Sequence, residues 1–168
     1  SMATIGLPEA LAHTPALEAK DFVVLSELTN RTGDTMFDDT LTEALAVQLR
    51  QSPFLNVVPD QRVQATLRMM QRPAGTPVDV ATGRELCQRV GARALLTSSI
   101  ASLGSSYVIT LGALDCVTGD TLAEQQAQAA LKEDVLRQLG EATHALREQL
   151  GESLPSLTRY DANVEAAT

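Results

Sequence analysis

The chain has 168 residues, which suits one domain with a full hydrophobic core and short extensions at its ends. Apolar residues make up 44% and aromatic residues only 3%, so we expect an aliphatic core without stacking platforms for bases or sugars. The formal net charge of −8 argues against nucleic acid or an anionic membrane as the main partner, because phosphate binding needs clustered Lys and Arg.

The two ends of the chain are not expected to belong to the folded domain. Ser1-Met2 resembles an expression scar, so the chain is expected to be a fragment of a longer protein. Residues 1–20 contain Pro8 and Pro15 without periodicity and predict a linker. No run approaches the roughly 18 apolar residues of a membrane span, so we expect no direct insertion by this fragment.

The first predicted strand is residues 22–25, which are apolar at every position and therefore suit the centre of a sheet. A polar loop over residues 29–34 follows it. The spacing of apolar residues then predicts a helix over 36–51, which Pro53 ends. Residues 55–58 predict a second short strand.

Two further helices are predicted, each with a recognisable start. Asp60 is expected to cap a helix that continues to about Gln71, and Asp79 to cap a helix over 80–90. Gly91 follows the second of these helices and suits the left-handed backbone that often ends a helix.

The second half of the chain changes to β-type sequence. Residues 94–101, 107–116 and 121–130 predict three antiparallel strands, joined by turns at 103–106 and 117–120.

A long amphipathic helix over 132–150 is predicted to follow, with Gly151 at its end and a tail over 152–168. The predicted order is β-α-β-α-α-β-β-β-α. This order predicts an α/β domain of α+β character over residues 21–151, with a mixed five-stranded sheet and about four helices.

The sequence NRTGDTMFDDTL, residues 30–41, joins the first strand to the first helix, a position where many proteins bind phosphates or metals. It lacks the second Gly and the Lys of a Walker A loop, the G-x-G-x-x-G pattern and the calcium-loop spacing. One reading is helix capping by Asp34 or Thr35, with Asp38 and Asp39 favoured by the helix dipole. The other is a ligand-binding loop made by Asn30, Arg31, Thr32, Gly33 and Asp34.

Residues for catalysis or metal binding are scarce. His13 and His144 stand alone, and neither they nor the cysteines have zinc-site spacing. A catalytic Ser or Cys would need a His partner as its base, and no such pair or nucleophile elbow is evident. We therefore expect no catalytic residue, no metal and no cofactor, and a domain that is not an enzyme.

The two cysteines, Cys87 and Cys116, are expected to lie close together. If the 103–106 turn places Ser102 opposite Tyr107, then Cys116 lies opposite Arg93, just beyond the helix that carries Cys87. A disulfide would form in an oxidising compartment, and otherwise both side chains would be buried thiols.

Two long stretches resemble the N-terminal domain of TolB. The first, DFVVLSELTNRTGDTMFDDTLTEALAVQLRQSPFLNVV, matches an apolar strand, an N-x-[TS]-G-D loop and a helix with an LTEAL core. The second, GRELCQRVGARALLTSSIASLGSSYVITLGALDCVTGDTLAE, matches the later strands and their D-x-x-T-G end. The sequence departs from the family pattern at Glu27-Leu28, where an aromatic residue is usual, and at Ser98, which replaces a Gly.

More narrowly, residues 16–168 resemble the region between the transmembrane helix and the tetratricopeptide repeats of bacterial eukaryotic-like serine/threonine kinases. The lead-in PALEAKD and the closing NVEAAT, which would lead into the repeats, carry this part of the resemblance. The kinase itself is not in this chain, since its glycine loop, H-R-D and D-F-G motifs are missing.

The resemblance implies a non-catalytic sensory or protein-interaction domain on the periplasmic or cell-surface side of a single-pass membrane kinase. Its partner would be another protein or a second copy of the chain, and that location would favour the disulfide. The alternative is a sensor that binds a small molecule in a cleft near residues 30–34.

Overall fold

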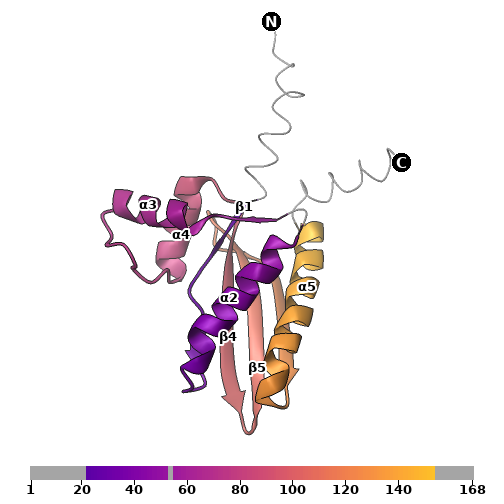
Figure 1. Cartoon of the computed structure of the whole chain (residues 1–168). Helices are drawn as coiled ribbons and strands as arrows, with labels where there is room; N and C mark the ends of the chain where they lie inside the picture. Colours follow the sequence, from indigo (N-terminus) through magenta and orange to yellow (C-terminus); the bar gives the residue numbers. More distant parts are fainter. Residues whose placement is uncertain (1–21, 53–54, 154–168) are drawn as a thin grey trace, which may run out of the picture.

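A computed structural model describes residues 22–52 and 55–153 of the chain, and Figure 1 shows how its helices and strands are arranged. The elements follow one another as β1 (Phe22–Leu25), β2 (Thr29–Arg31), α2 (Met36–Arg50), β3 (Asn56–Val57), α3 (Asp60–Met69), α4 (Val80–Val90), β4 (Ala94–Leu103), β5 (Ser106–Asp115), β6 (Thr121–Ala129), a 3₁₀ turn (Lys132–Asp134) and α5 (Val135–Ser153). The predicted class, a mixed sheet with four helices, is confirmed. The predicted lead-in 1–20 lies outside the described residues, as does the predicted tail 152–168 except for its first two residues, which belong to α5.

The sheet has six strands rather than the five predicted, in the order β3-β1-β4-β5-β6. The additional strand is β2, which the sequence placed inside a polar loop. It pairs in parallel with β4, as β1 and β3 pair with their neighbours, whereas β4, β5 and β6 are antiparallel. Both β1 and β2 therefore lie along one side of β4. Between them Ser26 donates its N–H and its hydroxyl to the Leu96 carbonyl, at 2.9 and 3.0 Å.

The hairpin between β4 and β5 has the predicted register, with Ser102 opposite Tyr107. Gly104 makes this possible, because its φ of 62° lies in the left-handed region that a tight turn requires. β6 continues the meander, although its Ala and Gln residues have weak strand propensity. Its pairing with the central strand β5 over eight positions is a tertiary contact that propensity does not measure.

The helices cover the sheet unequally. In Figure 1, α2 and α5 lie along one face of the long strands, while α3 and α4 lie together at one end of the sheet. The larger core lies under α2 and α5 and includes Phe37, whose ring meets Tyr107 edge-to-face at 5.3 Å. The smaller core lies under α3 and α4 and contains both cysteines.

Two of the three predicted features at the starts and ends of α3 and α4 are confirmed. Asp79 Oδ1 accepts a 2.8 Å hydrogen bond from the Thr82 N–H at the start of α4, and Gly91 ends that helix at φ 73°. The prediction for Asp60 is wrong, because Pro59 occupies the capping position and Asp60 is the first helical residue. There the carboxylate still lies in the first turn, where the helix dipole favours negative charge.

The last helix also differs from its prediction. α5 begins at Val135, after the 3₁₀ turn, and continues through Gly151 to Ser153. A glycine in a terminal turn weakens a helix by only about 1 kcal/mol, which packing upstream can offset. The buried positions Val135, Leu139, Leu146 and Leu150 supply that packing against the sheet.

Candidate functional site

The predicted loop of residues 30–34 is a corner held by its own polar groups, and Asn30 is at its centre. The Asn30 amide donates to the Asp34 carbonyl at 2.8 Å and to Asp38 Oδ1 at 2.9 Å. Its oxygen accepts from the N–H and hydroxyl of Thr32, at 2.9 and 2.7 Å. Gly33 has φ 82°, which allows the chain to reverse between these contacts.

Asp34 joins this corner to both helices that cover the larger core. Its Oδ1 accepts a 3.0 Å hydrogen bond from the Met36 N–H at the start of α2. Its Oδ2 accepts a 2.7 Å hydrogen bond from Lys132 Nζ, just before α5. The hydrogen bond from Lys132 is the main cause that lowers the pKa of Asp34, and the Met36 N–H lowers it further. The same contact raises the pKa of Lys132.

The five predicted ligand residues are thus only partly brought together. Asn30, Thr32 and Asp34 form one network with Gly33 at its bend, and each polar group described above has an intramolecular partner. Arg31 is exposed and alternates with Asn30 along β2, so its side chain leaves from the opposite face of the strand. The arrangement fits the capping reading directly, since it uses the Asp34 carboxylate to satisfy a free helix N–H.

We predict that Lys132→Met raises the pKa of Asp34 toward the usual value of a free aspartate, because the largest lowering contact is removed. The Asp34 carboxylate stabilises the fold fully above its unfolded pKa of about 3.9, and this contribution is lost as the pH falls through the lower folded pKa. NMR titration of the side-chain carboxyl carbons measures the change. Asp79, whose pKa is lowered chiefly by the Thr82 N–H, is the internal control and should not move. An unchanged Asp34 pKa in the variant would show that Lys132 does not hold this carboxylate.

The predicted cysteine pair is brought together by α4 and the end of β5. Cys87 is fully buried and Cys116 is 3% exposed, and their sulfurs are joined with the Cα atoms 5.7 Å apart. That Cα separation lies within the usual range for disulfides. The expected juxtaposition follows from the hairpin register, which extends to Ala94 opposite Asp115.

Side chains of α4 also hold the turn at Cys116, through hydrogen bonds to its main chain. Arg84 donates to the carbonyls of Cys116 and Val117 at 3.2 and 2.6 Å, and Gln88 donates to that of Cys116 at 3.1 Å. Asp115 Oδ1 accepts from the N–H groups of Val117 and Thr118, each at 2.9 Å. The bond from Thr118 is the main cause that lowers the pKa of Asp115.

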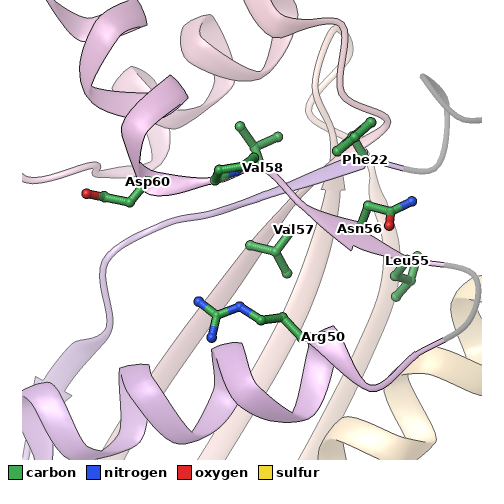
Figure 2. A pocket seen from close by; sticks show the side chains of 8 residues that line it. Phe22, Arg50, Leu55, Asn56, Val57, Val58 and Asp60 are labelled. Atoms are coloured by element: carbon green, nitrogen blue, oxygen red, sulfur yellow. The ribbon is translucent and has the colours of Figure 1, made fainter.

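A pocket of about 450 Å³ lies between the end of α2 and the short edge strand β3, and the sequence analysis did not find it. Figure 2 shows the Arg50 side chain extending from the last turn of α2 toward Val57. The lining residues are Phe22, Arg50, Leu55, Asn56, Val57, Val58, Pro59 and Asp60. Its surface is about equally polar and apolar, and the polar lining residues, Arg50, Asn56 and Asp60, are all exposed.

Metal and catalytic chemistry find little support in the part of the chain that the structure describes. Within it, no group of three His, Cys, Asp or Glu side chains could hold a metal ion. His144 is exposed on α5 and lies beside Arg147 and Glu148, at 3.4 Å from each. Among the described helices, none is both long and apolar enough to cross a membrane.

The far edge of the sheet is a second feature that the sequence analysis did not single out. β6 pairs with β5 on one side and is the last strand of the sheet as described, so the groups on its outer side are not paired with a further strand. The predicted three-stranded meander already indicated this edge, because the third strand of a meander lies at the edge of the sheet unless another strand pairs with it.

Comparisons with known proteins identify the fold. No protein-family model matches the chain, and no curated protein matches it by sequence. Among solved structures, the C-terminal domain of LpoB from Salmonella enterica matches with a TM-score of 0.59 and 15% identity, over 71% of this chain and 93% of that one. Lipoprotein GNA1162 from Neisseria meningitidis matches with a TM-score of 0.54 and 18% identity, over 80% and 99%.

TolB from Acinetobacter baumannii also matches, with a TM-score of 0.48 and 12% identity, over 80% of this chain and 28% of that one. That superposition is too loose to carry an argument, so the fold rests on the two closer matches. The chain therefore has the mixed α/β fold shared by the LpoB C-terminal domain and lipoprotein GNA1162.

Proposed function

We propose that the chain is a non-catalytic domain that binds another protein outside the cytoplasm. The observation that carries the proposal is the fold shared with the LpoB C-terminal domain and GNA1162, combined with an unpaired sheet edge on the described domain. Sheet edges present main-chain donors and acceptors that an incoming strand can satisfy.

The described interactions of the candidate side chains are structural in kind. His144 contacts Arg147 and Glu148, neither of which is a nucleophile of the type that a histidine base activates. The corner at residues 30–34 uses its amide and carboxylate groups within the fold. The pocket described above lies beside β3 and not at residues 30–34, and a small-molecule sensor is kept as an outcome of the test below.

The extracytoplasmic location rests on two observations. GNA1162, which shares the fold, is a lipoprotein by name. The structure also joins Cys87 and Cys116, and such bonds persist mainly in oxidising compartments. We further propose, from the resemblance of residues 16–168, that the parent is a membrane serine/threonine kinase with tetratricopeptide repeats. Sequencing the gene upstream should then reveal a hydrophobic span preceded by a kinase domain, and a different upstream region would refute this setting.

Thermal unfolding in fractions of an extracytoplasmic extract from the source cell tests the function itself. A ligand present at about 100 times its Kd stabilises the folded state by about 2.7 kcal/mol, which raises Tm by several degrees. We expect this rise in the macromolecular fraction, and expect it to disappear after protease treatment of that fraction. A rise in the small-molecule filtrate alone would overturn the proposal in favour of the sensor.

A further inference from the structure

Within the described residues, the outer edge of β6 presents main-chain groups that point away from β5 at alternate positions from Glu124 to Gln128. The Glu124 N–H donates to Gln149 Oε1 on α5 at 3.2 Å, so the main chain of Glu124 points away from β5. Because main-chain groups alternate along a strand, those of Gln126 and Gln128 also point outward. The register with β5 is regular from Ala123 to Ala129, which keeps this alternation intact.

This edge lacks most of the features that block strand pairing. Proteins commonly protect an edge with Pro, Lys, inward-pointing charges or bulges. From 122 to 130 the sequence is LAEQQAQAA, with Glu124 as its only charge, in a chain of net charge −8. The one register shift between β5 and β6 falls at Leu122, where Ala113 pairs with Ala123 and Leu114 with Thr121, so the regular edge begins at Ala123. The side chain that reaches this edge from α5 is also uncharged, since Gln149 Oε1 accepts from the Glu124 N–H at 3.2 Å and from the Gln125 amide at 2.7 Å.

We propose that the β6 edge pairs with β6 of a second copy of this chain, antiparallel about a two-fold axis at Gln126. The inference rests on the proposed function and names the partner of this surface. Gln126 then lies opposite its own copy, and Glu124 lies opposite Gln128 of the second copy. About four main-chain hydrogen bonds form even if Gln149 keeps its bond to the Glu124 N–H.

A second copy suits this edge because the pairs that the axis creates are compatible in size and charge. Ala123 and Ala129 are equally spaced from Gln126, so two small side chains meet on the helix side of the sheet. The single charge meets a neutral amide rather than another Glu, which avoids the destabilising pairing of like charges. The opposite edge, β3, is a poorer candidate because it has only two residues and Pro59 follows two positions later.

Cysteine cross-linking tests the register directly. In the proposed pair the Gln126 Cα atoms are about 5.5 Å apart, within disulfide range, whereas those of Gln128 are about 14 Å apart. Under mild oxidation, Gln126→Cys should yield a covalent dimer that reductant reverses, and Gln128→Cys should stay monomeric. Equal cross-linking of both variants, or none at Gln126→Cys, would overturn the proposed pairing.

Sedimentation equilibrium provides a second readout without cross-linking. Wild type should show a concentration-dependent dimer, and Gln126→Lys should be at least tenfold weaker, because two lysines would then face each other. Met69→Lys on α3, where the side chain is 75% exposed, is the matched control and should dimerise like wild type. Unfolding curves verify that both variants fold. A monomeric wild type would contradict the proposed pairing of β6 with a second copy. Stabilisation by the macromolecular extract would still support the proposed function in that case.

Discussion

Replacing Cys87 and Cys116 together by alanine is expected to lower the free energy of unfolding by about 3–4 kcal/mol. The bond closes a loop between residues 29 apart in sequence. Without it the unfolded chain gains conformational entropy, and the chain-entropy model predicts a destabilisation of this size for a loop of this length. Both side chains are buried in the smaller core, so lost packing adds to the effect. Chemical denaturation of the oxidised wild type and of the double variant measures the difference.

Reduction of the wild type separates the bond from the packing. A non-thiol reductant should destabilise the wild type and leave the alanine variant unchanged. If the reduced wild type unfolds at the same denaturant concentration as the oxidised protein, the disulfide does not stabilise this fold. The contacts of Arg84 and Gln88 with the Cys116 carbonyl would then hold the turn by themselves.

Leu111→Ala is expected to lower the free energy of unfolding by about 2–5 kcal/mol. Leu111 is fully buried in the centre of β5, within the core that α2 and α5 cover. Truncation there removes a large side chain from the larger core and leaves a cavity. Urea unfolding followed by circular dichroism measures the loss.

Leu103→Ala is the matched control, because Leu103 is 63% exposed at the end of β4. Its effect should stay within about 0.5 kcal/mol, as for most surface substitutions. Equal losses at the two positions would contradict the placement of the larger core under α2 and α5.

Features set by local sequence were predictable. Asp79 and Gly91 mark the ends of α4 through side-chain capping and a left-handed backbone, each of which depends on one residue. The register of β4 with β5 follows from the short turn between them, and it correctly brought Cys116 near Cys87.

Features set by distant partners were not predictable in this way. The three residues of β2 are polar and form a strand only because β4 offers them an edge, 70 positions along the chain. In the corner at residues 30–34 the capping role of Asp34 could be inferred, but its ion pair with Lys132 spans 98 positions. The pocket beside β3 and the free edge of β6 likewise depend on strand order, which local pattern does not determine.

The central claim is that this domain binds another protein outside the cytoplasm, and one cross-linking experiment can measure both the binding and the compartment. A photoreactive amino acid replaces Gln126 in the full-length protein, intact source cells are irradiated, and spheroplasts from them are treated with protease from outside. The account predicts a discrete protein adduct that this external protease destroys. Absence of any adduct, or an adduct that survives until the membrane is lysed, would contradict it.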